Sequence, residues 1–499
     1  MRKKKSFKNF ITSIIPYFIL LFLGFYRTRV FIDGLGDEIY ALNTLFYQIF
    51  IYLSLAEAGA GAYVMQLYYK YFANGDKDKI ISTYNAIKRW LRKAAVAIIL
   101  IGIIVSFGLK LLTNNNLSLI YMQIVFFLFL LKNAVDYLMM APKSVIEADQ
   151  KVYVINFRFY LFRIFEYIVD IVLLYFGVNY IYILIGEIIT RFLTYLITNK
   201  RIFKEYQWLN DKPKEITKLK GVSNIFWLRI SEAVHFNTDI IITSSFLTPL
   251  LVTIYSSYNY LTKYLTDMTD MVGNAITPSF GNSIYKDEKQ NMIRIFEQIN
   301  ITFLYIAAFA SSMVFILGNA FVKNIWLTSK YGMEFLAFIL LVVNFFIVIA
   351  RKPLNGYRNS KGLFKETKVI VLLEAIINLV LSLILVKPYG LTGILIATTI
   401  SMVTTTLWYM PYYIYKKDLK TSVSKYFIRL LFVFTLTALI SYLGYYLINV
   451  FNIHTIWGWL IFASISGIVL ILFYTVIFYL FFNEFRETIA KVKDLIKRK

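Results

Sequence analysis

Apolar runs of about 20 residues recur along the whole chain, separated by short polar or charged segments. A run of that length lets an α-helix cross the hydrocarbon core of a bilayer. The pattern predicts 14 transmembrane helices and leaves no room for a soluble domain. The expected spans are residues 9–29, 38–67, 94–112, 117–140, 153–176, 179–198, 222–246, 249–282, 295–321, 331–350, 368–386, 390–414, 427–449 and 456–482.

The chain also carries a weak internal repeat at an offset of 211 residues. At that offset Tyr47 aligns with Tyr258 and Pro142 with Pro353, and the order of long span, charged loop and proline-containing loop recurs. Six spans separate the copies, so both would have the same orientation, as in transporters built from parallel repeats. We therefore expect an all-α polytopic membrane protein in which two six-helix lobes enclose a central cavity.

The expected lobes are residues 1–210 (spans 1–6) and 215–420 (spans 7–12). Residues 425–499 hold spans 13 and 14 and a basic cytoplasmic tail. Between Leu430 and Phe482 there is no Asp, Glu, Lys or Arg, so these two spans should be the most exposed to lipid.

Composition agrees with a membrane protein. Hydrophobic residues make up 59% of the chain and charged residues 16%, well below the roughly 25% of soluble domains. There is no cysteine and only two histidines, which excludes disulfides, thiolate chemistry and a histidine-rich metal site. The N-terminal MRKKKSFKNF precedes an apolar run without a small-residue cleavage site, so we take that run as the first span.

The distribution of basic residues orients the helices and accounts for the net charge of +24 without nucleic-acid binding. With both termini in the cytoplasm, most Lys and Arg residues fall in cytoplasmic segments, as the positive-inside rule requires. Six fall outside: Arg27, Arg29, Lys110, Lys323, Lys330 and Lys387. With both termini on one side, the number of spans must be even, so an error of one pair in the count of 14 would make it 12.

Ionisable side chains inside the spans gather on single helix faces. Taking 100° per residue, the four ionisable residues in 229–239 cover an arc of about 120°, and those in 163–170 and in 263–270 about 60° each. Charges at this depth usually face a polar cavity or each other. The residues concerned are Arg229, Glu232, His235 and Asp239; Arg163, Glu166 and Asp170; Lys263, Asp267 and Asp270; Glu187 and Arg191; and the single acids Glu57 and Asp136.

Pairing is the alternative explanation for these charges. Glu187 and Arg191 are spaced i,i+4, which permits a salt bridge, and Arg229 could pair with Glu232 or Lys263 with the acids that follow it. A structural hydrogen bond explains His235 better than a proton relay does. Arg27 and Arg29 could be interfacial anchors, and most cytoplasmic Lys and Arg residues only set topology.

Common catalytic machinery is absent from the sequence. It contains no GxxxxGK[ST], HExxH or GxSxG pattern, and the segment GLGDE at Gly34 lies between two spans rather than in a nucleotide-binding unit. The outside loops are about ten residues or shorter, which disfavours a membrane glycosyltransferase or polysaccharide polymerase. Transport energy would come from an ion gradient, the membrane potential or consumption of product. Asp239, Asp267 and Asp270 could bind Na⁺ or H⁺ as coupling ion, and no other cofactor is expected.

Over nearly its whole length the chain resembles bacterial polysaccharide flippases of the multidrug/oligosaccharidyl-lipid/polysaccharide exporter superfamily, and the N-terminal signature carries most of the likeness. The shared features are an arginine ending the first helix, LGDE from Leu35, LAEAG from Leu55 and GDK from Gly75. Three later segments are also similar: EADQKVY from Glu147, TDIIITSSFL from Thr238 and KPYGLTGILIATTIS from Lys387. One departure is Ala41, where the family has glycine after the tyrosine.

The resemblance implies flipping of undecaprenyl-pyrophosphate-linked repeat units to the outer leaflet of the bacterial cytoplasmic membrane, for O-antigen, capsule or a similar glycan. A cationic cavity would bind the headgroup, with Arg27, Arg29, Arg163, Arg191, Arg229 and Lys263 as candidates. The buried acids nearly match these bases in number, which argues against strong positive charge. Membrane lipids, a polysaccharide polymerase and a chain-length regulator are the implied partners. Alternatives are a multidrug or cation antiporter of the same superfamily and a flippase for peptidoglycan precursors.

Overall fold

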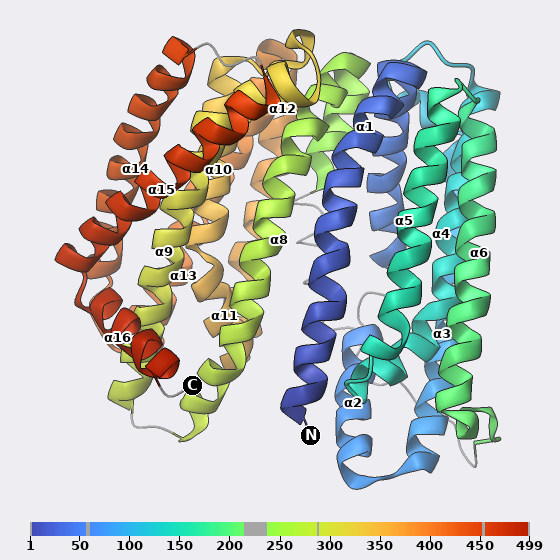
Figure 1. The fold of residues 1–499 in the computed structure, drawn as a ribbon, viewed down its shortest axis with the longest axis horizontal. Coiled ribbons are helices and arrows are strands. Elements are labelled where there is room, and N and C mark those ends of the chain that lie inside the picture. The colour runs from blue at the N-terminus through green and yellow to red at the C-terminus, as the bar shows by residue number, and fades with distance from the viewer. Residues whose placement is uncertain (1, 56–59, 214–236, 287–288, 452–454, 498–499) are drawn as a thin grey trace. The chain divides into compact units, whose positions relative to one another are not determined.

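The computed structural model describes residues 2–55, 60–213, 237–286, 289–451 and 455–497, which are helical with no strand (Figure 1). This confirms the expected all-α membrane fold. Contacts divide the chain into an N-terminal unit, Met1–Val252, and a C-terminal unit, Thr253–Lys499. In the described residues eight helices are long and apolar enough to cross a membrane.

Six α-helices of the N-terminal unit cover the first six predicted spans. Residues 237–246 are also helical, whereas the rest of the predicted span 222–246 lies outside the described residues. The helices are α1 (Arg2–Ser54), α2 (Ala60–Asn74), α3 (Lys77–Ser106), α4 (Leu119–Ala148), α5 (Tyr153–Tyr175) and α6 (Tyr180–Glu205), with short 3₁₀ turns η2 (Leu109–Leu111) and η3 (Gln207–Asn210).

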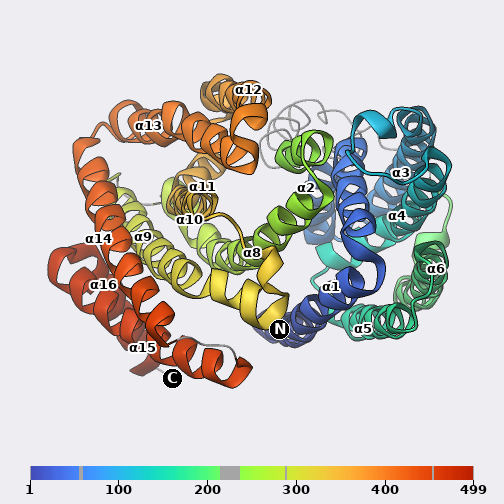
Figure 2. The ribbon, with the colours of Figure 1, turned by 90° about the horizontal axis from the view of Figure 1, so that it is seen from above.

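Helix α1 joins the first predicted span to most of the second. The GLGDE segment forms a kink rather than a loop, because only Gly36 leaves the helical conformation, with φ 79° and ψ 173°. That φ is accessible to glycine without steric cost. Around the kink, α1 packs on α5, while α4 packs between α3 and α6 (Figure 2).

The C-terminal unit comprises nine helices in the residues described. They are α8 (Pro249–Lys286), α9 (Lys289–Ala320), α10 (Phe335–Ala350), α11 (Lys352–Lys361), α12 (Phe364–Thr404), α13 (Thr406–Tyr412), α14 (Ser424–Phe451), α15 (Ile456–Phe481) and α16 (Asn483–Lys497). Shorter turns are the π-helical η4 (Phe321–Trp326) and η6 (Tyr413–Asp418) and the 3₁₀ turn η5 (Ser329–Tyr331). Helix α12 merges two predicted spans across Gly390, whose φ is 55°.

Helix α9 is the centre of this unit and packs on α10, α14, α15 and α16. A buried hydrogen-bonded group ties three of these helices together: Ser312 of α9 lies 2.7 Å from the Tyr474 hydroxyl of α15 and 2.9 Å from the Ser441 hydroxyl of α14. Such buried hydroxyls satisfy one another where no water can reach.

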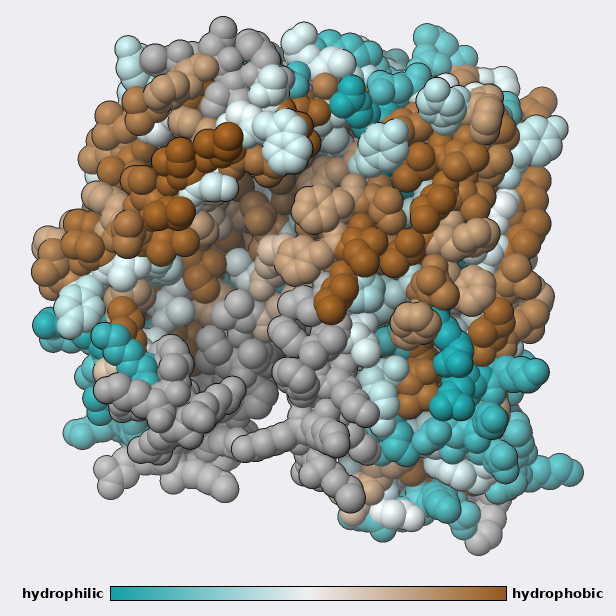
Figure 3. Space-filling view, in the orientation of Figure 1, coloured by the Kyte–Doolittle hydropathy of each residue, from teal (hydrophilic) through white to brown (hydrophobic). Residues whose placement is uncertain are grey.

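Large apolar side chains cover the outside of the helices. Figure 3 shows a brown band between teal ends, as expected for a protein whose middle faces hydrocarbon. The most apolar stretch of α15 is only 11% buried, against 72% for that of α9 with its following turn. Helices α14 and α15 therefore present most of their surface to lipid.

Ion pairs hold helix α16 to α14, and an aromatic contact holds it to α9. Glu484 receives hydrogen bonds from Arg429 at 2.7 Å and from Lys425 at 3.0 Å, and Phe485 stacks on Tyr305 with ring centroids 5.2 Å apart. Partial burial opposes ionisation of Glu484, but these two cations outweigh it and lower the pKa of its carboxyl to about 2.

A tyrosine, an aspartate and a lysine close one end of the N-terminal unit. The Tyr206 hydroxyl, after α6, donates to Asp149, after α4, at 2.6 Å. Lys151 lies 2.9 Å from the same carboxylate and 5.3 Å from the centre of the Tyr206 ring. We call this group the N-unit latch, because it joins the ends of the two helices.

The same residue types form a C-unit latch. The Tyr357 hydroxyl of α11 donates to Asp418 of η6, and Lys361 lies 3.4 Å from that carboxylate and 5.8 Å from the Tyr357 ring. The two lysines lie 210 residues apart, one residue short of the repeat offset, and the tyrosine and the aspartate stand on exchanged helices. Tyrosine follows the sixth span in one unit and the fourth predicted span in the other.

We expect Tyr206→Phe to lower the free energy of unfolding by about 1.5–3 kcal/mol, because the hydrogen bond it removes ends on a charged acceptor. The measurement is the thermal midpoint of the purified protein in detergent. Tyr175→Phe is the matched control, since the Tyr175 side chain is 78% exposed. Equal midpoints for the two variants would contradict a stabilising role for the latch.

Candidate functional site

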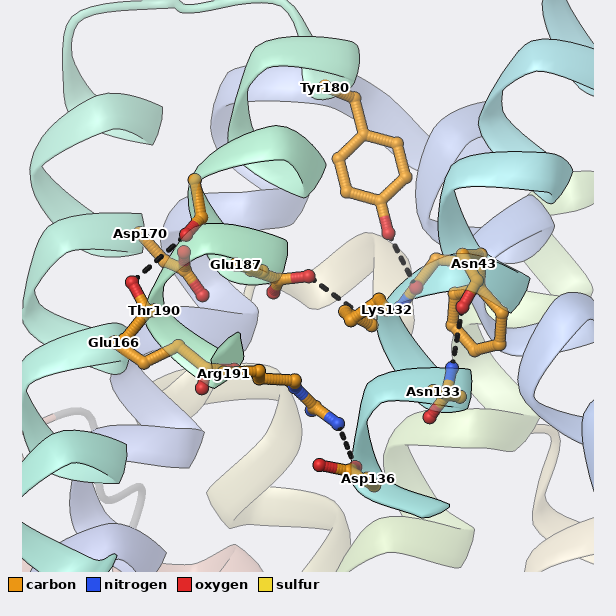
Figure 4. Close-up of polar contacts among 12 residues, drawn as sticks. Asn43, Lys132, Asn133, Asp136, Glu166, Asp170, Tyr180, Glu187, Thr190 and Arg191 are labelled. Atoms are coloured by element: carbon orange, nitrogen blue, oxygen red, sulfur yellow. Dashed lines mark hydrogen bonds and ion pairs between the residues drawn. The ribbon is translucent and has the colours of Figure 1, made fainter. Parts of the chain in front are cut away.

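Eight charged side chains from four helices of the N-terminal unit are linked by ion pairs, and we call them the N-unit charge network. Figure 4 labels its members on α4 and α6, with Glu166 and Asp170 of α5. Helices α4, α5 and α6 each contribute residues spaced by three or four positions, which places them on one face of their helix. The members are Arg27 of α1; Lys132 and Asp136 of α4; Arg163, Glu166 and Asp170 of α5; and Glu187 and Arg191 of α6.

Glu187 is the centre of one half of the network. Its two carboxylate oxygens accept from different helices: Oε1 from Arg27 Nη2 at 2.7 Å and Oε2 from Lys132 Nζ at 2.8 Å. Arg27 also donates through Nε to Asp170 at 2.7 Å. These three bonds connect α1, α4, α5 and α6 through a single glutamate and a single arginine.

Arg191 is the centre of the other half. Its Nη1 donates to Asp136 of α4, and its Nε lies 3.6 Å from Glu166 of α5. Arg163 reaches the same glutamate oxygen at 3.3 Å. The ion pairs of Glu187 and Arg191 thus run to other helices, so the i,i+4 pair that the sequence permits is replaced by contacts across the unit.

The network is neutral, with four cations and four anions, but its exposure is uneven. The side chains of Asp170 and Glu187 are each 3% exposed, whereas those of Arg27, Arg163 and Asp136 are 20%, 30% and 40% exposed. Buried charges of this kind are tolerated only while each is paired. Arg27, Arg163 and Asp136 are therefore the partly exposed members of the network, and we call them the polar rim.

Uncharged polar groups extend the same interior. The Tyr180 hydroxyl of α6 donates to Asn43 of α1 at 2.6 Å, beside the Lys132 and Glu187 pair in Figure 4. Tyr180 and Lys132 were not among the residues that the sequence singled out as site candidates. Lys132 could have been found, because it lies one turn before Asp136 on an otherwise apolar helix.

The remaining N-terminal candidates lie elsewhere or outside the described part of the chain. Arg29 pairs with Asp33 at 3.7 Å on an exposed face of α1. Asp239 is 4% exposed, and its neighbour Thr238 makes a 2.5 Å hydrogen bond with the Tyr52 hydroxyl. Glu57, Arg229, Glu232 and His235 lie outside the described residues.

The three candidates on α8 belong to the C-terminal unit. Lys263 is exposed and Asp267 half-buried, while Asp270 pairs with Lys352 of α11. Lys352 Nζ lies 2.5 Å from the Asp270 carboxylate and donates to the carbonyl of Thr266 at 2.8 Å. The cation that meets Asp270 therefore comes from another helix.

One buried ion pair of the C-terminal unit was missed by sequence reasoning. Arg351, counted among the cytoplasmic charges, is 7% exposed and donates to both oxygens of Glu374 on α12 at 2.9 and 3.2 Å, and to Thr406 of α13. Glu374, the single acid of the predicted span 368–386, is the signal that could have revealed it. Among the described residues no group of three or more His, Asp or Glu side chains is arranged to hold a metal ion.

Of three comparisons with known proteins, the one with solved structures places the fold. No protein-family model matches the sequence, and no curated protein matches it either. A solved structure of the lipid II flippase MurJ, in an inward closed conformation, superposes with a TM-score of 0.68 at 15% identity and covers 94% of this chain and 99% of its own.

Transporters of the MOP superfamily superpose less completely. An inward-facing MATE multidrug transporter gives a TM-score of 0.58 at 13% identity and covers 80% of this chain and 96% of its own. A MOP superfamily transporter from Pyrococcus furiosus gives 0.56 at 11% identity, covering 84% and 97%. The chain therefore has the fold of a membrane flippase and of multidrug transporters, and these similar structures are transport proteins rather than enzymes.

We expect Glu187→Gln to destabilise the protein by about 3–5 kcal/mol, because it leaves Arg27 and Lys132 as buried cations without full compensation. Denaturant or thermal unfolding in detergent measures the loss. Glu205→Gln at the end of the same helix is the control, since its 3.4 Å contact with Lys151 is exposed and worth about 1 kcal/mol or less. If the charge network did not stabilise the fold, the two variants would have equal free energies of unfolding.

Proposed function

We propose that this protein moves a lipid-linked oligosaccharide between the leaflets of the bacterial cytoplasmic membrane by alternating access, with both termini in the cytoplasm. The observation that carries the proposal is the likeness to the lipid II flippase structure, which accounts for 94% of this chain, against 80% for the multidrug transporter. A substrate with a diphosphate headgroup, sugars and a long apolar tail also suits the site chemistry described above.

The polar rim of the N-unit charge network is the proposed contact for the headgroup. A guanidinium binds phosphate oxygens in a two-pronged geometry, and Arg27 and Arg163 are the partly exposed arginines of the network. The sugars would meet hydroxyl and amide groups, and the apolar tail could stay in lipid beside the helices. Arg191, only 12% exposed, would position these two arginines rather than bind substrate itself.

Neutrality of the network gives ion coupling a physical basis. An arriving diphosphate that takes Arg27 from Asp170 leaves that carboxylate uncompensated in a site where it is 3% exposed. A proton or Na⁺ taken up by the acid would restore neutrality, since unpaired charge at this depth is costly. We propose that substrate binding and cation uptake are linked in this way.

A multidrug or cation transporter is the second candidate, because MATE structures share the fold. The rim favours the flippase: it presents two arginines and one acid, whereas a site for organic cations should expose mainly acidic and aromatic groups. A glycan repeat unit of the O-antigen or capsule kind is the proposed cargo. A polysaccharide polymerase and a chain-length regulator would then act on the product at the outer face.

The test is leaflet-resolved detection of lipid-linked oligosaccharide in cells with and without the protein. An impermeant lectin reports the outer leaflet, and total lipid extraction reports the whole pool. We expect loss of the protein to remove the outer signal while the inner pool grows. If both pools stay the same, the flippase proposal fails, and efflux of cationic dyes becomes the assay of choice.

Substitutions then test the rim. We expect Arg27→Gln and Arg163→Gln each to lower the outer-leaflet signal by about tenfold or more, the equivalent of one charge-assisted hydrogen bond. Arg29→Gln is the control, because Arg29 lies on the same helix as Arg27 but outside the network. Protein amount and monodispersity are measured for each variant. Normal flipping by well-folded Arg27 and Arg163 variants would exclude the rim from headgroup binding.

A further inference from the structure

Helix α8 has a buried face and, on its opposite side, a polar face that stays partly exposed. Tyr258, Thr262 and Thr269 of the buried face are 0%, 7% and 6% exposed. On the opposite side, five residues with polar side chains lie within an arc of about 120°, taking 100° per residue. We call them the α8 stripe: Tyr260, Lys263, Tyr264, Asp267 and Asp270.

The α8 stripe contains two opposite charges that do not pair. Lys263 and Asp267 are spaced i,i+4, which permits a salt bridge. Within the described residues, however, neither takes part in an ion pair or a hydrogen bond. Asp270 pairs with Lys352 of α11, and its side chain remains 55% exposed. With Lys352 included, two cations face two anions, so this part of the unit carries no net charge.

Two tyrosines form the other edge of the stripe. The hydroxyls of Tyr260 and Tyr264 lie 2.9 Å apart, and their rings meet edge to face with centroids 4.6 Å apart. Tyr260 also lies 6.0 Å from the ring of Trp326 in η4, which is 4% exposed and so supports the tyrosine from the protein interior. The faces of aromatic rings are partially negative and attract polarised C–H bonds.

Contact with lipid does not explain the stripe. The exposed face of α15, with Ile461, Ile465 and Leu472 at 61%, 56% and 61% exposure, is apolar, and that helix has no charged residue. An interfacial aromatic belt would account for Tyr260 but not for charges one and two turns further along the span. Since charges at this depth face a polar cavity or each other, the stripe requires a polar occupant.

We propose that the α8 stripe binds a pyranose ring of the transported glycan, a contact that rests on the flippase function proposed above. A sugar hydroxyl accepts a hydrogen bond from the Lys263 ammonium and donates one to the Asp267 carboxylate, which gives both unpaired charges a partner. The C–H face of the sugar packs on the ring of Tyr264. The tyrosine hydroxyls bind further sugar oxygens.

The balance of charge selects a sugar over the other parts of the substrate and over other ligands. A diphosphate at the stripe would meet two carboxylates, Asp267 and Asp270. An organic cation would meet Lys263 and Lys352. A neutral ring with hydroxyls on its edge and C–H bonds on its face avoids both conflicts and matches the combination of charges and aromatic rings.

The test compares the affinity of the purified protein for undecaprenyl pyrophosphate that is bare or carries one glucose, galactose or N-acetylglucosamine, measured by native mass spectrometry. We expect the wild type to bind at least one glycosylated carrier about tenfold more tightly than the bare carrier, the equivalent of one or two hydrogen bonds. Tyr264→Leu with Asp267→Asn should bring this ratio to about one. Binding of the bare carrier shows that the variant is folded.

Two control variants separate the sugar contact from other effects. Tyr442→Leu removes a tyrosine of α14 that is 63% exposed, and it should keep the ratio of the wild type. Arg27→Gln should weaken binding of bare and glycosylated carriers alike and so keep the ratio as well. Tyr264→Phe with Asp267→Asn preserves the shape of the stripe and should lower the ratio to about threefold, which covers the case in which the leucine variant fails to fold. A stripe variant with the ratio of the wild type would overturn the proposal.

A measurement without the lipid carrier distinguishes failure of the sugar contact from failure of the flippase function. In saturation-transfer NMR with the methyl glycosides of the same three sugars, we expect transfer from the wild type and its loss in Tyr264→Leu with Asp267→Asn. Transfer in a protein that binds no carrier would support the sugar contact and contradict the proposed function. Carrier binding with a ratio of one and no transfer would overturn the sugar contact alone, and absence of both signals would overturn both proposals.

Discussion

Charge neutrality inside a low-dielectric helix bundle is the constraint on which the N-terminal unit depends. The buried cations of α4 and α6, Lys132 and Arg191, each meet an acid from a neighbouring helix, since an uncompensated charge would cost more than most helix contacts supply. Glu187 and Arg27 satisfy this condition for four helices at once. The same pairing leaves three members at a partly exposed rim, so the group that holds the helices is also the group that a charged substrate could reach.

The C-terminal unit meets the constraint with fewer charges and more hydroxyls. One buried pair, Arg351 with Glu374, joins α10, α12 and α13, while Ser312, Ser441 and Tyr474 join α9, α14 and α15. Hydroxyl groups can be satisfied without carrying net charge into the bilayer. The charge-rich interior of the N-terminal unit is therefore a special property of that half and not a general requirement of the fold.

The sequence was sufficient for the fold and for the faces that carry charge, because apolar run length and the 3.6-residue period are local properties. It was not sufficient to determine which charged residues pair with one another. Glu187 and Arg191 were close enough in sequence to pair, yet each pairs across helices, a choice made by packing. The segment GLGDE was expected to separate two spans, but a single residue at positive φ, Gly36, turns α1 without ending it. Arg351 was assigned to a loop by its sequence neighbours, although folding buries it.

The reciprocal latches have a consequence for how the two halves of this chain can be compared. At the offset of 211 residues, a residue-by-residue alignment sets Tyr206 against Lys417 and Asp149 against Ser360, so it records no identity at either latch. A comparison of interactions records the same type of bond, from a tyrosine hydroxyl to an aspartate, in both units. The acceptor precedes the donor along the chain in the N-terminal unit and follows it in the C-terminal unit. Pairs of interacting residues can thus reveal a likeness between two halves that identities along the sequence do not record.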